Sequence, residues 1–340
     1  MGFFSFLTQE IAIDLGTANT VIIHNDRVVV DEPSIVAIER NTGKVIAVGR
    51  IAQQMHGKTH ENIKTIRPLR DGVIADFNAA EYMIRGLIKM INQGKRLFAP
   101  SLRMVICIPS GITEVEKRAV KDSAEHAGGK EVYLIHEPMA AALGIGIDVE
   151  EPMGNMIVDI GGGTSDIAII ALGGIVCDKS IRIAGDELTA DVEDYMRRQH
   201  NILVGERTAE RIKIEVGAAL PELDNPPPDF PVHGRDLMTG VPKEIYVSYT
   251  EISHSLDKSI AKIEEAILNA LEVTPPELSA DIYRTGIYLT GGGALLRGLD
   301  KRISLKTKLP VHVAEDPLRA VARGTGIALK NADKFPFLLR

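Results

Sequence analysis

Apolar residues recur along this chain both in short runs and at helical spacing, a combination that predicts an α/β protein. Runs typical of buried strands occupy 28–30, 34–38, 45–48, 104–108 and 132–135. Between such runs, apolar residues return every three or four positions, as they do on one face of a helix. The clearest helix is predicted over 78–92, with Met83, Ile84, Leu87, Ile88 and Ile91 on one side. Strands that alternate with amphipathic helices are typical of layered α/β folds.

Polar residues and glycines mark where some of these elements begin and end. Thr113 and Glu116 form the Thr-x-x-Glu pattern of a capping box, which predicts a helix from this point to Ala127. Two glycines follow Ala127 and end the helix. A proline-rich stretch at 221–231 interrupts the second half of the chain and predicts an exposed loop.

Two segments share one pattern: an apolar strand ends in an aspartate, a Gly/Thr-rich turn follows, and a second apolar strand begins. Asp14 ends the first such strand and Asp159 the second. Turn glycines let backbone N–H groups approach phosphate oxygens, and a carboxylate at a strand end can hold a hydrated Mg²⁺. One copy alone is an ordinary turn. The duplication predicts a nucleotide between two halves, with its phosphates held by Thr17, Ala18, Asn19, Gly161, Gly162 and Gly163.

A third glycine turn, 290–294, also follows an apolar strand and precedes a helical pattern at 295–299. We expect its backbone to contact the nucleoside or the phosphates. No G-x-x-x-x-G-K-[ST] sequence is present, and both aspartate turns lead into a strand, whereas a Walker-type phosphate loop leads into a helix.

Composition narrows the classes of protein that remain. With 340 residues, of which 45% are hydrophobic, the chain is long enough for about two domains. The net charge of −7 and the dispersed Lys and Arg residues argue against a nucleic-acid partner. Cys107 and Cys177 lack metal-binding spacing, which favours free thiols in a reducing compartment. No stretch is long and apolar enough to span a bilayer, and 1–7 lacks the basic start and cleavage site of a secretory signal. We therefore expect a cytoplasmic protein.

Five stretches, taken together, resemble the superfamily of actin, sugar kinases and heat-shock chaperone ATPases, and within it the bacterial actins. They occur in the order expected for that family and span nearly the whole chain, at 14–20, 67–76, 137–142, 234–242 and 289–299. The resemblance implies an actin-like ATPase fold of two duplicated αβ domains around a nucleotide cleft. Four subdomains would result: IA (1–31, 73–147 and 320–340), IB (32–72), IIA (148–182 and 250–319) and IIB (183–249).

The resemblance also implies a function. A bacterial actin binds ATP with Mg²⁺, hydrolyses it slowly, and polymerises with itself into paired protofilaments at the inner face of the cell membrane. Its partners there would be membrane-anchoring and cell-wall synthesis proteins of the elongation machinery, which maintain rod shape. Two alternatives share the fold: a sugar or acetate kinase, and a chaperone ATPase. The second would lack its substrate-binding domain, since only 41 residues follow Leu299.

Four acidic residues receive roles in this scheme, each with a simpler alternative. Asp14 and Asp159 would hold Mg²⁺ through water, or else merely cap their turns. Glu137, placed before Pro138 at a helix start, would orient the hydrolytic water, or else only interact with the helix dipole. Asp166 would lie near that water or the metal, as related proteins have it, or else be an ordinary hairpin aspartate.

The remaining candidates bind the nucleoside or the membrane. In the segment Glu210, Arg211, Ile212 and Lys213, spacing alone predicts a solvated Glu210–Lys213 ion pair on a helix capped by Thr208. The resemblance assigns these two residues to ribose and adenine, with Gly291, Gly292, Gly293 and Ala294 completing the nucleoside side. Two apolar segments without an evident core role are candidate membrane anchors, or else pack against the rest of the protein in the ordinary way. They contain Phe3, Phe4, Phe6, Leu7, Leu97 and Phe98.

Overall fold

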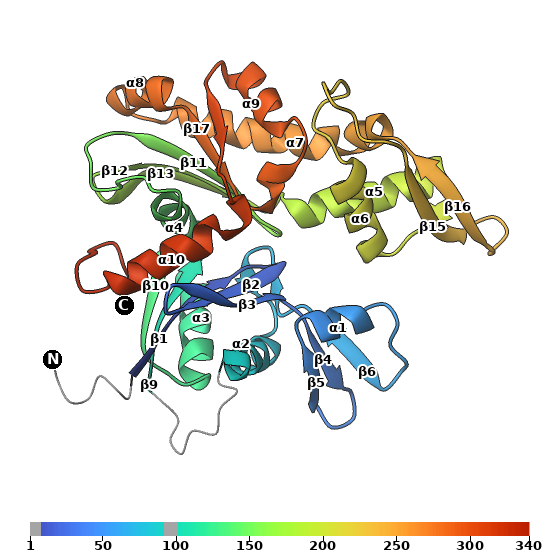
Figure 1. The fold of residues 1–340 in the computed structure, drawn as a ribbon, viewed down its shortest axis with the longest axis horizontal. Coiled ribbons are helices and arrows are strands. Elements are labelled where there is room, and N and C mark those ends of the chain that lie inside the picture. The colour runs from blue at the N-terminus through green and yellow to red at the C-terminus, as the bar shows by residue number, and fades with distance from the viewer. Residues whose placement is uncertain (1–7, 92–100, 340) are drawn as a thin grey trace.

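The computed structural model of this chain describes residues 8–91 and 101–339. The candidate membrane residues Phe3, Phe4, Phe6, Leu7, Leu97 and Phe98 lie outside the described residues. Within the described part, two five-stranded sheets lie on either side of a central pair of helices (Figure 1).

The first large sheet has the strand order β10-β9-β1-β2-β3. Its strands are β1 (Thr8–Leu15), β2 (Asn19–His24), β3 (Arg27–Pro33), β9 (Ser101–Ile108) and β10 (Gly129–His136). The meander β1-β2-β3 is antiparallel, whereas β9 lies parallel to both β1 and β10. The apolar strand runs expected from the sequence at 28–30, 104–108 and 132–135 lie in this sheet. Val30 and the other two runs supply part of its core, whereas Val28 and Val29 are exposed.

The second large sheet repeats this topology. Its order is β13-β12-β11-β17-β18, and its strands are β11 (Asn155–Ile160), β12 (Ser165–Ala171), β13 (Gly174–Ile181), β17 (Ile287–Thr290) and β18 (Val311–Val313). The meander β11-β12-β13 is antiparallel, and β17 lies parallel to β11 and β18. The duplication expected from the two aspartate turns is therefore a duplication of a whole sheet.

Helices cover both faces of each sheet (Figure 1). The outer face of the first sheet carries α2 (Phe77–Ile91) and α3 (Glu114–His126), and the second sheet is covered by α7 (Tyr249–Glu272). Two further helices, α8 (Pro276–Thr285) and α9 (Leu299–Thr307), pack beside β11 and β18. The expected capping box is present: the Thr113 hydroxyl accepts from the Glu116 N–H and the Glu116 carboxylate accepts from the Thr113 N–H.

Two smaller units extend from the large sheets on one side of the molecule (Figure 1). One contains α1 (Arg50–Met55) and a sheet of β5 (Val45–Val48), β4 (Val36–Glu39) and β6 (Ile63–Ile66). The other contains α5 (Gly185–Gln199), α6 (Glu206–Val216) and a sheet of β14 (Ile202–Leu203), β15 (Phe230–Asp236) and β16 (Pro242–Val247). A short hairpin of β7 (Leu69–Arg70) and β8 (Val73–Ile74) returns the chain to the first sheet.

Two local expectations were wrong. The helix with Glu210 and Lys213 begins at Glu206, because Gly205 is the extended residue that precedes it, so Thr208 lies within the first turn and is not the cap. The helical pattern expected at 295–299 is interrupted: a 3₁₀ turn, Gly292–Leu295, ends before Leu296, and Gly298 adopts a left-handed conformation with φ of 75° before α9 begins.

The central helices α4 (Glu137–Gly144) and α10 (Ala320–Lys330) lie between the two sheets. α10 packs on β1, β2 and β9, while α4 packs on β11 and β12. The two helices touch through their backbones. A Cβ at Gly144 would overlap the carbonyl oxygen of Ala320, and one at Gly324 would overlap that of Ala140. Each glycine is required because no side chain fits between the helices at this crossing.

We therefore expect Gly324→Ala to destabilise the protein severely. The methyl group would meet backbone atoms of α4, which cannot rotate away as a side chain does, so the cost should reach at least about 3 kcal/mol, the upper end of overpacking penalties. Urea unfolding without nucleotide measures this loss.

Gly326→Ala is the matched control in the same helix. Its Cβ would have Ile23 Cγ2 as nearest neighbour at 3.4 Å, an ordinary contact, and alanine is favoured over glycine in a helix by about 1 kcal/mol. Equal unfolding free energies for the two variants would contradict the close crossing of α4 and α10.

Candidate functional site

The two aspartate turns lie against each other at the carboxyl ends of β1 and β11. A Cβ at Gly162 would lie 2.8 Å from the Cβ of Ala18, and one at Gly163 would lie 2.7 Å from Oγ1 of Thr17. The Thr17 hydroxyl also accepts a hydrogen bond of 3.0 Å from the Gly72 N–H. Three segments far apart in the sequence therefore meet at one point, and Gly162 and Gly163 are needed because any side chain there would separate the turns.

Four carboxyl groups gather behind these turns. Asp14 and Asp159 are each the last residue but one of β1 and β11, Asp166 lies in β12, and Glu137 is the first residue of α4. Burial raises the pKa of Asp14 to about 6 and that of Asp159 to about 7. Burial also raises the pKa of Asp166, and it raises that of Glu137 well above its ordinary value, with the negative charges of Asp166, Asp159 and Asp14 adding to the effect. The cluster therefore disfavours further negative charge unless a cation is present.

Each of the two strand-end aspartates accepts one side-chain hydrogen bond. The Cys107 thiol donates to Asp14 Oδ1 at 3.1 Å, and the Thr290 hydroxyl donates to Asp159 Oδ1 at 2.8 Å. Asp166 Oδ1 accepts from the backbone N–H of Ser110 at 2.9 Å. Burial raises the pKa of the Cys107 thiol well above its ordinary value, so the thiol keeps its hydrogen.

These residues fit a hydrated Mg²⁺ better than a metal held by protein ligands alone. Across residues 8–91 and 101–339, no three His, Cys, Asp or Glu side chains converge closely enough to hold a metal ion. Mg²⁺ characteristically keeps several waters and binds through one or two carboxylates together with phosphates. Separate carboxylates at two facing strand ends suit that kind of binding.

The expected nucleoside residues connect to the second turn through hydrogen bonds. Lys213 Nζ donates to the Gly185 carbonyl at 2.8 Å and lies 2.6 Å from Glu210 Oε2. The Gly185 N–H in turn donates to the Gly161 carbonyl at 3.1 Å, and the Asp186 N–H donates to that of Gly162 at 2.8 Å. The Lys213 side chain is only 13% exposed. The predicted Glu210–Lys213 ion pair is therefore present, with Lys213 largely covered beside α5 and the Glu210 side chain still 44% exposed.

Two other residues of that segment point elsewhere. Ile212 is fully buried in the hydrophobic core, and the Arg211 guanidinium lies over the ring of Phe230 at 5.2 Å. Their side chains are therefore not available to the site.

The third glycine turn closes the site beside β11. Gly291 has φ of 79°, and its N–H donates to the Pro317 carbonyl at 2.9 Å. Gly291 and Gly293 lie so close to Ile160 that a Cβ at either would overlap it, whereas Gly292 is exposed. Ala294 is buried behind the turn. Gly292 is thus the residue of this turn with backbone open to a ligand.

Charged side chains join the two smaller units across the cleft, and we call Arg67, His56, Glu206 and Asp186 the clasp. Arg67 pairs with Glu206 and lies 3.6 Å from Asp186, while His56 Nε2 lies 3.4 Å from Glu206 Oε2. Because the Asp186 N–H is bonded to the second turn, the clasp and the phosphate turns form one connected structure. No local pattern predicts these pairs, since their members lie far apart in the chain.

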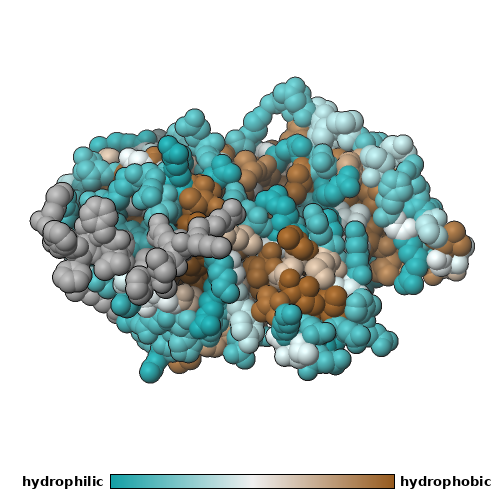
Figure 2. All heavy atoms as spheres, turned by 60° about the horizontal axis from the view of Figure 1, so that its bottom comes forward, coloured by the Kyte–Doolittle hydropathy of each residue, from teal (hydrophilic) through white to brown (hydrophobic). Residues whose placement is uncertain are grey.

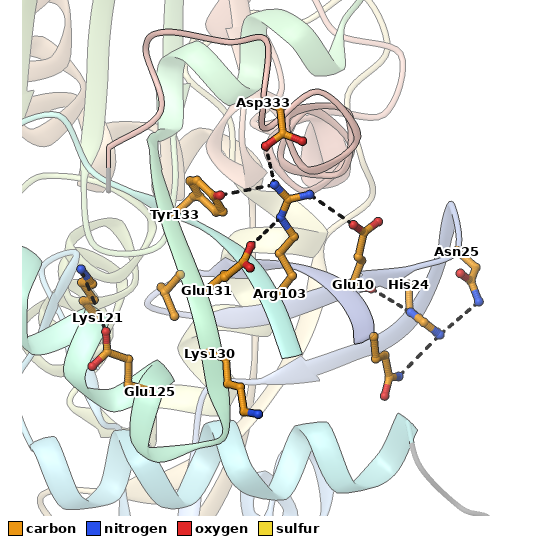
Figure 3. Close-up of a pocket in the computed structure, with 12 residues that line it drawn as sticks. Glu10, His24, Asn25, Arg103, Lys121, Glu125, Lys130, Glu131, Tyr133 and Asp333 are labelled. Carbon is orange, nitrogen blue, oxygen red and sulfur yellow. Dashed lines mark hydrogen bonds and ion pairs between the residues drawn. The ribbon is translucent and has the colours of Figure 1, made fainter. Parts of the chain in front are cut away.

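A cavity of about 1020 Å³ lies away from this site. Figure 3 shows Arg103 at its centre, paired with Glu10, Glu131 and Asp333 and bonded to the Tyr133 hydroxyl. Glu10 belongs to the amino-terminal part of β1, and Asp14 to its other end. Ligands of open α/β sheets bind at the carboxyl ends of the strands. The cavity is therefore not the candidate nucleotide site, and Arg103 ties the segment after α10 to the first sheet.

Comparisons with known proteins agree with this geometry. The family model for MreB/Mbl protein matches residues 8–336. The chain is 49% identical over 329 residues to the cell shape-determining protein Mbl of Bacillus subtilis, covering 96% of this chain and 98% of that protein. It is 46% identical over 336 residues to the cell shape-determining protein MreB of Escherichia coli, covering 97% and 96%.

A solved structure of a related protein is similar over nearly the whole chain. The crystal structure of MreB5 of Spiroplasma citri bound to AMPPNP has a TM-score of 0.90 and 40% identity, covering 96% of this chain and 97% of that one. The same protein bound to ADP gives a TM-score of 0.90 at 39% identity, with coverage of 96% and 99%. The fold is therefore an actin-like α/β fold, as the sequence predicted.

We expect Arg67→Ala to loosen the cleft. Both Arg67 and Glu206 side chains are 36% exposed, and pairs of this kind contribute at most about 1 kcal/mol. The amides of Gly161, Gly185 and Asp186 should then exchange with deuterium up to roughly five-fold faster, as about 1 kcal/mol permits.

Arg50→Ala is the control, because Arg50 of α1 lies 3.7 Å from Glu32 of β3 in the first large sheet, and this pair does not connect the two smaller units. It should leave exchange at those three amides unchanged. Equal protection in Arg67→Ala and the wild type would show that the clasp does not hold the cleft closed.

The buried carboxyls also predict an unusual pH dependence for the protein without nucleotide or metal. Since burial raises the pKa of Asp159 to about 7, the folded state binds more protons than the unfolded state between about pH 4 and 7. The free energy of unfolding therefore loses this contribution as pH rises through that window. Relative to the wild type, Asp159→Asn should gain stability towards pH 7, by at most about 1.4 kcal/mol per pH unit.

Urea unfolding at a series of pH values in EDTA measures this difference. Asp224→Asn is the control, because the ion pair with Lys301 lowers the pKa of that exposed carboxyl and so predicts the opposite sign. A difference between Asp159→Asn and wild type that stays constant with pH would rule out a raised pKa at Asp159.

Proposed function

Because this chain belongs to the MreB/Mbl protein family, we propose that it is a bacterial actin that binds ATP with Mg²⁺, hydrolyses it slowly and helps to determine cell shape. Relatives named as cell shape-determining proteins, and one solved with AMPPNP and with ADP, support this proposal. The observation that carries it is the meeting of two glycine turns in front of four carboxyl groups, of which those of Asp159 and Asp166 are buried and those of Asp14 and Glu137 are half-buried.

The turns supply the phosphate site in this proposal. Backbone N–H groups of Gly162 and Gly163, together with Thr17, Ala18 and Asn19, would donate to phosphate oxygens. The Gly161 N–H already donates to the Thr164 carbonyl at 2.9 Å, so Gly161 would shape the turn and not donate to phosphate. Asp14 and Asp159 would hold Mg²⁺ through water, and the metal would neutralise charge that develops on the phosphates. Glu210, Lys213 and the backbone at Gly292 would hold the nucleoside, since hydrogen bonds connect the first two to the phosphate turn.

Glu137 would orient the attacking water. Its carboxyl is fixed at the start of α4, where Pro138 presets the helical backbone. Burial and the neighbouring carboxylates raise the pKa of Glu137, which favours its protonated form, so positive charge would be needed to favour the carboxylate, the form that accepts from water. This requirement favours slow hydrolysis that depends on a bound metal. Asp166 lies in β12, next to the strand that carries Asp159, and would support the same water or the metal.

Assembly and location complete the proposal. The chain would polymerise with itself into paired protofilaments at the inner face of the membrane, alongside anchoring and cell-wall synthesis proteins. Subdomains IA, IB, IIA and IIB, bounded as the resemblance implies, would be its rigid parts.

Figure 2 shows hydrophobic side chains gathered on one face of the molecule. Exposed apolar residues of the first half include Val28, Val29, Ile46, Ile51 and Met90, and such surface suits contact with another protein or with lipid.

The proposed contact with the membrane rests on the sequence alone. It would involve Phe3, Phe4, Phe6, Leu7, Leu97 and Phe98. Among residues 8–91 and 101–339, the structure contains no helix long and apolar enough to cross a membrane. Attachment would accordingly be to the membrane surface, and a filament would strengthen it by repeating each weak anchor.

We expect Glu137→Ala to bind ATP and polymerise but to release phosphate about 10²–10⁴-fold more slowly, the usual cost of losing a group that acts on the proton of the reacting water. Phosphate release from purified protein with Mg-ATP, with electron microscopy of the same samples, measures both properties.

Glu114→Ala is the control, since Glu114 is also the first residue of a helix but is exposed and pairs with Lys117. It should hydrolyse ATP at the wild-type rate. If Glu137→Ala did so too, Glu137 would have no part in catalysis, and its carboxylate would serve only the helix dipole. Failure of the wild type to bind ATP or form filaments would overturn the proposed function itself.

A further inference from the structure

The two halves of the molecule place a side-chain donor beside each strand-end aspartate in the same topological position. β9 lies parallel to β1 in the first sheet, and β17 lies parallel to β11 in the second. In the register of these pairs, Ile13 lies opposite Ile106, and Asp159 lies opposite Thr290. Cys107, the residue after Ile106, is therefore the counterpart of Thr290. One donor is a thiol and the other a hydroxyl.

Both donors take the same oxygen of their aspartate. Cys107 Sγ lies 3.1 Å from Asp14 Oδ1, and Thr290 Oγ1 lies 2.8 Å from Asp159 Oδ1. Cys107 is 2% exposed and Thr290 is fully buried, so water cannot replace either donor. A Cβ at Gly291 would lie 2.8 Å from Asp159 Oδ1, so the glycine after Thr290 leaves room for that oxygen.

We propose that Cys107 and Thr290 are paired positioning residues, which hold one oxygen of Asp14 and of Asp159 so that the other oxygen of each carboxylate faces the metal. This inference rests on the proposed function, because it assigns a task to two residues behind the predicted Mg²⁺ site. A carboxylate with one oxygen held in place loses less rotational freedom when its other oxygen binds a hydrated cation.

The difference between the two donors has a consequence. A thiol is a weaker hydrogen-bond donor than a hydroxyl, so Asp14 is held less firmly than Asp159. The two halves of the site are thus alike in topology but unequal in rigidity. Replacing the thiol by a hydroxyl in Cys107→Ser should keep Asp14 in place.

The test measures the Mg²⁺ concentration that gives half-maximal strengthening of ATP binding. Cys107→Ala and Thr290→Val remove the donors, and each should raise that concentration about 10-fold or more, as loss of groups that orient metal ligands does. ATP affinity in EDTA should stay unchanged, because the donors act only through the metal. Cys107→Ser and Thr290→Ser keep a donor and should stay within about three-fold of the wild type.

Two buried or part-buried groups serve as matched controls. Cys177 donates its thiol to the Val273 carbonyl, and Thr274 donates its hydroxyl to the Ala270 carbonyl, both away from the aspartates. Cys177→Ala and Thr274→Val should leave the Mg²⁺ requirement unchanged. If the donor-removing variants match these controls, the positioning role is overturned, even where their thermal stability is reduced.

An infrared measurement tests the thiol without nucleotide or metal. In a Cys177→Ala background, the protein has a single thiol, and its S–H stretching band reports the strength of the bond that Cys107 donates. The band should move towards that of a free thiol when Asp14→Ala is added. A band that does not move would show that Cys107 does not hold Asp14.

Absence of Mg-dependent ATP binding in the wild type would overturn the proposed function, whereas normal binding by Cys107→Ala and Thr290→Val would overturn only this inference.

Discussion

The crossing of α4 and α10 is the contact on which the rest of this structure depends. Gly144 and Gly324 bring two helix backbones together so closely that neither position can carry a side chain. α10 packs on the first sheet, and α4 packs on β11 and β12 of the second sheet as well as on β9 and β10 of the first, so the crossing joins the two halves through a rigid connection. Glu137 stands at the start of α4, and the crossing therefore fixes the depth at which this carboxyl enters the cleft between the sheets.

Electrostatics then decides what the cleft can hold. The duplicated sheets bring Asp14 and Asp159 to facing strand ends, and α4 adds Glu137 to the same buried space. Burial raises the pKa of each of the three, because a charged carboxylate loses its hydration there. Phosphates alone would worsen this repulsion. In the proposed function, a divalent cation brought in with them would relieve it, so nucleotide and metal would favour each other's binding.

Much of the fold followed from local patterns in the sequence, whereas the contacts that complete the site did not. The repeated strand-aspartate-turn pattern predicted two similar halves, and the structure confirms this as two sheets of equivalent order. Helical spacing placed Glu210 and Lys213 together, but not the burial of Lys213 under α5, which depends on packing between distant segments. Cys107 and Thr290 were missed for the same reason. Which residue lies beside an aspartate depends on strand register, and no local pattern encodes it.

The two connections between the halves differ in kind, and this difference defines how the cleft can move. Contact between α4 and α10 involves backbone atoms and leaves no room for sliding, so rotation about the crossing is the motion it permits. Arg67, Glu206 and Asp186 join the smaller units through part-exposed charges, which contribute only about 1 kcal/mol. The phosphate turns lie between these connections, and the Asp186 N–H is bonded to the second turn. A ligand that shifts this turn therefore acts directly on the weaker connection, while the stronger one keeps Glu137 in place.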